Sequence, residues 1–92
     1  MTVAPPLISV ILPAYNCAKY LPAALESILS QTLSNFELLV IYDESKDATL
    51  ELIQRYAQKD QRIQLVYGKK ERLVGALNLG ISLSRGQFIA RM

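Results

Sequence analysis

The acidic side chains that could do chemistry in this sequence gather in one short segment, Asp43-Glu44-Ser45-Lys46-Asp47, directly after an apolar run. A carboxylate at the end of a buried strand can accept a hydrogen bond from an N–H group of a ligand, or it can satisfy backbone N–H groups of its own loop. We take Asp43 as the candidate binding residue. Asp47 is placed to cap the helix that follows, so we assign it a structural role.

The basic side chains are densest at Lys69-Lys70-Glu71-Arg72, and residues 47–92 carry a net charge of +4 against −2 for residues 1–46. A patch this small suits a phosphate better than a nucleic-acid duplex, and we expect no nucleic-acid partner. A guanidinium can bind a phosphate through two hydrogen bonds or stack on a base, so Arg72 is the candidate. Lys69 and Lys70 are interpreted as solvated charges.

Several kinds of site are excluded by composition. The 92 residues contain no histidine and one cysteine, Cys17, which rules out an internal disulfide, the usual zinc sites and the Cys/His or Ser/His/Asp catalytic sets. Cys17 has no charged neighbour in sequence and is interpreted as inert. The apolar runs are too short for a membrane span, the first residues do not form a signal peptide, and we expect a cytoplasmic setting.

The elements that must position these side chains alternate between two hydrophobic periods. Short β-branched runs predict strands over residues 7–12, 36–42, 63–67 and 87–91. Helical spacing of apolar residues predicts a helix from Tyr20 to about Leu33, a second opened by Asp47 and a third ending near Ser84. The order βαβαβαβ implies right-handed crossovers, a mostly parallel sheet and a three-layer, Rossmann-like α/β unit. We expect one domain over residues 1–92, with residues 1–6 as an extended tail.

Parallel α/β sheets bind ligands at the carboxyl ends of their strands. The loop expected after the first strand, Pro13-Ala14-Tyr15-Asn16, has no glycine, and the first glycine of the chain is Gly68. A Rossmann dinucleotide site and a Walker A loop are therefore excluded. Pro13 fixes the direction in which the loop leaves the strand, and Tyr15 offers a flat face for a base or ribose, although Tyr15 could equally pack over the sheet edge.

Five segments together resemble the family 2 glycosyltransferases, which have the GT-A fold. They are Ser9-Val10-Ile11-Leu12-Pro13-Ala14-Tyr15-Asn16, Leu25–Thr32, Phe36–Thr49, Gly75–Ile81 and Ser84–Met92. Each motif alone is weak, but they occur in order and with the family's spacing over residues 7–92. Glu44 departs from the pattern, because the family usually has glycine there.

The resemblance implies the amino-terminal, nucleotide-diphosphate-sugar-binding part of an inverting glycosyltransferase, with a UDP-sugar as the favoured donor. It assigns nucleotide binding to Pro13, Ala14, Tyr15, Asp43 and Arg72, with Asp43 accepting the ring N–H of uracil. The family's metal-binding Asp-x-Asp and its catalytic base follow the segment that matches residues 84–92. We therefore expect no catalytic or metal-binding residue within this chain, a divalent Mn or Mg only in the longer enzyme, and no transfer by these residues alone.

Alternatives of other classes stay open. One is a non-catalytic nucleotide-binding module, and another is an interaction domain with a degenerate site. A flavodoxin-like receiver domain shares the β/α order but needs an acidic pair after the first strand, where this chain has Pro13-Ala14-Tyr15. We also expect the chain to dimerise through an uncovered sheet edge at residues 87–92. Membrane association of a longer parent protein is left open.

Overall fold

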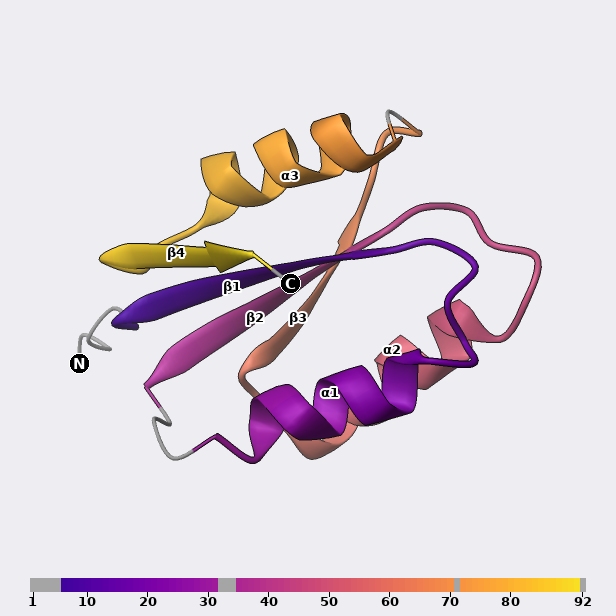
Figure 1. The fold of residues 1–92 in the computed structure, drawn as a ribbon, viewed down its shortest axis with the longest axis horizontal. Helices are drawn as coiled ribbons and strands as arrows, with labels where there is room; N and C mark the ends of the chain where they lie inside the picture. Colours follow the sequence, from indigo (N-terminus) through magenta and orange to yellow (C-terminus); the bar gives the residue numbers. More distant parts are fainter. Residues whose placement is uncertain (1–5, 32–34, 71, 92) are drawn as a thin grey trace.

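The structure is a computed structural model that describes residues 6–31, 35–70 and 72–91, the side chain of Arg72 excepted. Its elements follow the expected alternation of strands and helices (Figure 1). The strands are β1 (Ile8–Ala14), β2 (Phe36–Tyr42), β3 (Ile63–Tyr67) and β4 (Phe88–Arg91), and the helices are α1 (Leu21–Leu29), α2 (Thr49–Lys59) and α3 (Arg72–Leu83). The extended tail expected over residues 1–6 lies almost wholly outside the described residues.

The four strands form one parallel sheet with the order β3-β2-β1-β4. β1 pairs with β2 along its whole length, from Ile8 opposite Phe36 to Ala14 opposite Tyr42. The described residues of β4 pair with β1 from Ile8 opposite Phe88 to Ile11 opposite Arg91. The chain reverses its direction of travel across the sheet between β1 and β4, and ligands of such sheets bind at the carboxyl ends of the strands near this reversal.

Helices cover both faces of the sheet, with α1 and α2 on one side and α3 on the other (Figure 1). Every residue of β2 is buried, as expected for a parallel strand in the middle of three layers. Alternate residues serve the two faces: Leu38 and Val40 belong to the core under α1 and α2, whereas Leu39 and Ile41 pack with Ala76 of α3. The three-layer α/β prediction is confirmed.

Two predicted boundaries are wrong. Pro13 and Ala14 were expected in a loop but are the last residues of β1. The carbonyl of Ala14 accepts the amide of Asp43 on the β2 side. Successive residues of a parallel strand turn their backbone N–H and C=O groups toward opposite neighbours, so the Pro13 nitrogen, which carries no hydrogen, faces away from β2 and interrupts no hydrogen bond between β1 and β2. The first helix ends at Leu29, where the amide of Ser30 bonds back to Glu26, and not near Leu33, which lies outside the described residues.

The edge strand β4 is exposed at all four residues, with Phe88 59% and Ile89 48% accessible. Dimerisation through this edge stays a prediction. None of the described helices combines the length and the apolar character that a membrane span requires.

Candidate functional site

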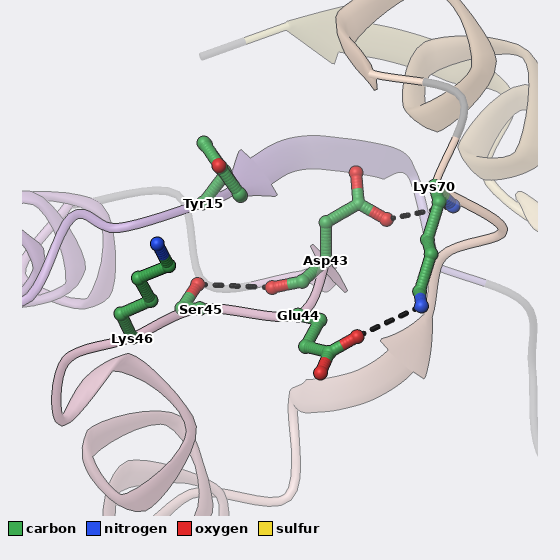
Figure 2. A pocket seen from close by; sticks show the side chains of 6 residues that line it. All are labelled: Tyr15, Asp43, Glu44, Ser45, Lys46 and Lys70. Carbon is green, nitrogen blue, oxygen red and sulfur yellow. Dashed lines mark hydrogen bonds and ion pairs between the residues drawn. The ribbon is translucent and has the colours of Figure 1, made fainter.

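A cavity of about 300 Å³ opens at the carboxyl edge of the sheet (Figure 2). It is lined by side chains from the loops after β1, β2 and β3, namely Tyr15, Asp43, Glu44, Ser45, Lys46 and Lys70. A second hollow of about 350 Å³ shares Tyr15 and Asp43 with it and adds Pro13, Ala14, Cys17 and Leu73. Four of the five predicted nucleotide-binding residues therefore meet around two adjoining hollows.

Asp43 lies between these hollows, and two hydrogen bonds fix its position. Its amide donates to the carbonyl of Ala14 over 3.0 Å, and its Oδ1 accepts the amide of Lys70 over 3.2 Å. Gly68 makes this approach possible, because a Cβ at Gly68 would lie 2.3 Å from Oδ1 of Asp43. Among the described residues no hydrogen bond reaches Oδ2 of Asp43, so one carboxylate oxygen is left to accept a ligand N–H.

Lys70 forms the wall that the β3–α3 loop contributes. Its backbone is left-handed, with φ of 61°, which turns its amide onto Asp43. Its Nζ lies 2.8 Å from Oε2 of Glu44, and both side chains are about three-quarters exposed. The Lys70 hydrogen bond lowers the pKa of Glu44, and the same hydrogen bond raises the pKa of Lys70. An exposed ion pair of this kind contributes little stability, so an anionic ligand can compete for the ammonium group.

The loops after β1 and β2 are tied together through Asn16 and Ser45. Asn16 has a φ of 47°, its amide donates to Oγ of Ser45 over 2.8 Å, and its Oδ1 accepts the amide of Lys46 over 2.8 Å. Ser45 in turn donates its hydroxyl to the carbonyl of Asp43, 2.9 Å away, and its amide to the hydroxyl of Tyr42, 3.0 Å away. The expectation that Asn16 organises its loop is confirmed. These bonds fix the backbone that carries Tyr15, which is 49% exposed.

Asp47 has a structural role, as expected, but the prediction that it is the N-cap of the second helix is wrong. The residue at the N-cap position of α2 is Ala48. Oδ1 of Asp47 accepts both the amide and the hydroxyl of Thr49, and Oδ2 accepts the amide of Ala18 over 3.1 Å. The Thr49 hydrogen bond is the main cause that lowers the pKa of Asp47. Asp47 lies in the loop after β2 and therefore stabilises the loop after β1 through this hydrogen bond.

The described residues offer no built metal site. They contain no group of three or more histidine, cysteine, aspartate or glutamate side chains that could hold a metal ion. The adjacent acids at the cavity, Asp43 and Glu44, each accept a hydrogen bond from Lys70. Burial raises the pKa of the Cys17 thiol, which disfavours a thiolate ligand or nucleophile.

Two further outcomes concern the basic patch. Arg72 begins α3, but its side chain lies outside the described part of the chain, so its predicted role is untested. Lys70 was interpreted as a solvated charge, and its side chain is about three-quarters exposed; Lys70 also lines the cavity, where its amide contacts Asp43 and its ammonium contacts Glu44. The sequence signal for Lys70 was its place two residues after Gly68, at the carboxyl end of a strand. Glu44 and Ser45 were likewise not predicted as site residues.

Comparisons with known proteins agree with this geometry. The family model described as glycosyl transferase family 2 matches residues 9–92. An uncharacterized glycosyltransferase of Haemophilus influenzae is 38% identical over 88 residues, which are 95% of this chain and 27% of that protein. Chondroitin synthase of Escherichia coli is 34% identical over 95% of this chain and 13% of its own length. The chain thus spans about a quarter or less of these curated relatives.

Two solved structures share the fold. The mannosyltransferase PcManGT from Pyrobaculum calidifontis, in complex with GDP-Man and Mn²⁺, superposes with a TM-score of 0.81 and 26% identity, over 94% of this chain and 26% of that one. S. aureus TarS superposes with a TM-score of 0.78 and 28% identity, over 94% of this chain and 16% of that one. The chain belongs to glycosyltransferase family 2 and has a Rossmann-like GT-A fold.

Proposed function

We propose that these residues are the amino-terminal, donor-binding part of an inverting glycosyltransferase that takes its sugar from a UDP-sugar. The observation that carries the proposal is Asp43, whose Oδ2 is left for a ligand at the carboxyl edge of the sheet while its Oδ1 is fixed by Lys70. Uracil offers one ring N–H between two carbonyl groups. One available carboxylate oxygen matches that single donor.

The surrounding residues suit the rest of a nucleoside diphosphate. The exposed ring of Tyr15 borders both hollows and provides a surface on which a base or ribose can stack. Pro13 and Ala14 line the second hollow and contribute mainly backbone. The ammonium of Lys70 supplies positive charge toward the diphosphate, and Arg72 at the start of α3 is proposed to add a second cation.

The proposed transfer uses groups outside these residues for its proton and its metal. The acceptor hydroxyl attacks the anomeric carbon from the face opposite the nucleotide, the bond from that carbon to the diphosphate oxygen breaks, and the hydroxyl proton passes to a general base. One structural relative holds GDP-Man and Mn²⁺, which supports a metal-dependent longer protein. Asp43 and Glu44, the two adjacent acids at the cavity, are both engaged by Lys70, and the proposal places the metal ligands outside the described residues. The part described here binds and orients the donor.

Calorimetry on the 92-residue chain tests the binding half of this proposal. We expect UDP to bind more tightly than uridine, and uridine to bind more tightly than inorganic pyrophosphate, because both the base and the phosphates contribute. GDP is expected to bind more weakly than UDP. Equal affinity for UDP and pyrophosphate would show that the base is not recognised and would overturn the proposal.

The catalytic half is tested on a longer protein that contains these residues, by following UDP release from a panel of UDP-sugars in the presence of Mn²⁺. Release that depends on an added acceptor supports a transferase. UDP binding without release from any sugar donor would instead support the alternative of a non-catalytic nucleotide-binding module.

A further inference from the structure

A buried carboxylate lies at the edge of the sheet opposite the candidate site. Glu37, the second residue of β2, is 2% exposed, and it lies beside Ser9 of β1 in the sheet register. Burying an ionised carboxylate is costly unless it is paired and hydrogen-bonded. An apolar residue would fill the same space without that cost, so the acid calls for an explanation that packing alone does not give.

The partners of Glu37 all belong to β1 or to the turn between α3 and β4. The Ser9 hydroxyl donates to Oε2 of Glu37 over 2.5 Å, and the amide of Arg85 donates to the same oxygen over 2.7 Å. The guanidinium of Arg85 reaches Oε1 through Nε over 3.0 Å. The amide of Gly86 donates to Oγ of Ser9 over 2.7 Å, which extends the network by one step.

This network holds the turn between α3 and β4 close to β1. A Cβ at Gly86 would lie 2.5 Å from the amide nitrogen of Ser9, so only glycine allows the observed approach. Within the described residues, β4 comprises Phe88–Arg91, all of them exposed, and it pairs with β1 alone. Its first amide, at Phe88, donates to the carbonyl of Leu7 over 2.9 Å.

β4 runs parallel to β1, so its Arg91 end points toward the edge that carries Asp43. We propose that Glu37 is a positioning residue whose ionised carboxylate clamps the turn between α3 and β4 to β1. The clamp thereby holds the carboxyl end of β4 beside the edge of the sheet that carries Asp43. The clamp lies at the opposite end of the sheet from the cavity. It requires no nucleotide, and its test is independent of the proposed function.

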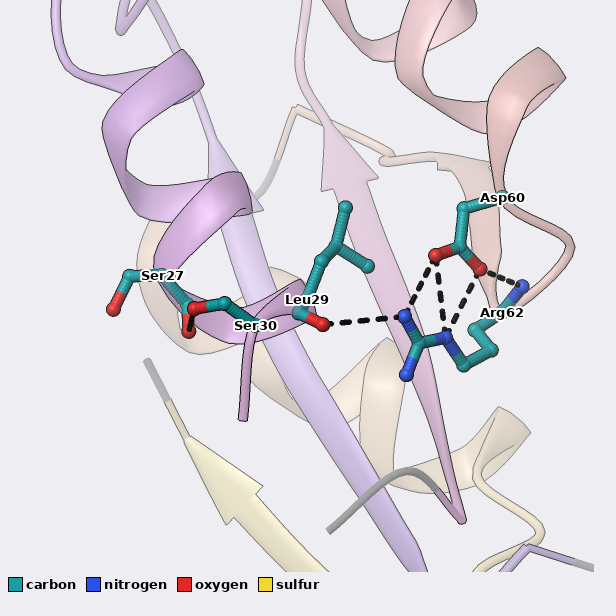
Figure 3. Close-up of polar contacts among 5 residues, drawn as sticks. All are labelled: Ser27, Leu29, Ser30, Asp60 and Arg62. Carbon is teal, nitrogen blue, oxygen red and sulfur yellow. Dashed lines mark hydrogen bonds and ion pairs between the residues drawn. The ribbon is translucent and has the colours of Figure 1, made fainter. Parts of the chain in front are cut away.

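The charges around Glu37 define a pH dependence. Burial alone would raise the pKa of Glu37, but the hydrogen bonds from Ser9 and Arg85 and the charge of Arg85 outweigh it and leave the pKa below its ordinary value of 4.5. The stabilisation is therefore complete above that value and is lost as pH falls through the lower folded-state pKa. Arg62 lines a hollow at this edge of the sheet together with Glu37 and Arg85, but its guanidinium is engaged by Asp60 (Figure 3).

Amide hydrogen exchange, measured by NMR on the 92-residue chain and corrected for intrinsic rates, tests the clamp. In the wild type we expect β4 amides to be protected at pH 6.5 and to lose protection as the pH is lowered below 4.5, while β2 amides at 38–41 keep theirs. E37Q has one acceptor oxygen for three donors, so its β4 amides are expected to exchange at least about tenfold faster at pH 6.5, with no further step at acid pH.

D60N is the matched control, because Asp60 is another arginine-paired carboxylate at the same sheet edge, and among the described residues its side chain bonds only to Arg62 (Figure 3). It should leave the ratio of β4 to β2 exchange unchanged. S9A, which removes the bridging hydroxyl, should loosen β4 selectively and serves if E37Q does not fold. Unprotected β4 amides in the wild type at pH 6.5, a pH-independent β4, or equal loosening of β2 and β4 in the variants would each overturn the proposal.

Discussion

Replacing Asp43 with asparagine distinguishes the roles of the two oxygens of the Asp43 carboxylate. In D43N the side-chain oxygen can still accept the amide of Lys70, so the contact between the β2 and β3 loops is retained. Asn keeps the size of Asp, and the close approach of Gly68 is unchanged. The atom that faces the cavity becomes an NH₂ group. A donor then meets the ring N–H of uracil, which is also a donor, and the hydrogen bond is lost.

The size of the effect follows from the kind of bond removed. A hydrogen bond to a charged group contributes about 1.5–3 kcal/mol, and about 2 kcal/mol corresponds to roughly a 30-fold weaker Kd. Calorimetry should show this loss for UDP and for uridine alike, because both present the same base. Pyrophosphate does not contact Asp43 in the proposed mode, and its affinity should rise slightly as one negative charge is removed.

E51Q is the matched control. Glu51 is exposed in the first turn of α2, and its substitution removes the same charge without changing the cavity lining. It should leave UDP affinity within about twofold of the wild type. D43N binding of UDP and uridine within about twofold of wild type would refute the assignment of Asp43 as the acceptor of the base N–H.

Three further substitutions test the walls of the site. G68A places a Cβ 2.3 Å from the Asp43 carboxylate, so the side chain must leave its rotamer and UDP titrations should show binding weaker by about two- to tenfold; unchanged affinity would mean that this orientation is unimportant. D47N puts an NH₂ group among backbone donors, and thermal unfolding should show a lower Tm with less effect on UDP affinity than D43N; the reverse order would contradict the structural role. E44Q frees Lys70 from its ion pair, so UDP should bind about two- to threefold more tightly while uridine does not change; weaker UDP binding would place the Glu44 carboxylate in ligand recognition.

The strands could be predicted from sequence because their signal is local. β2 and β3 have the predicted bounds, since continuous apolar runs in a parallel sheet are buried on both faces. The end of β1 could not be predicted, because proline lacks the backbone donor of a strand residue. Only the pairing of β1 with β2, which continues to Ala14, shows that strand pairing runs past Pro13.

The location of the site could be predicted from the sequence, but the predicted set of lining residues was incomplete. Parallel strands bring their carboxyl ends to one edge, and this placed Tyr15 and Asp43 together. Lys70 was missed because its contact with Asp43 depends on a left-handed backbone and on the closeness of Gly68. Glu37 lies in a strand that was predicted to be buried, but its hydrogen-bond network was missed because its partner Arg85 lies 48 residues further along the chain.

The central claim is that this chain binds a nucleoside diphosphate at the carboxyl edge of its sheet. NMR titration of the labelled chain with UDP tests it most directly. The claim predicts that the amides of Tyr15, of residues 43–46 and of residues 68–70 shift in a saturable way, while those around Glu37 and Asp60 at the opposite edge stay in place. Saturable shifts that gather at the opposite edge, or no shifts at millimolar UDP, would contradict it.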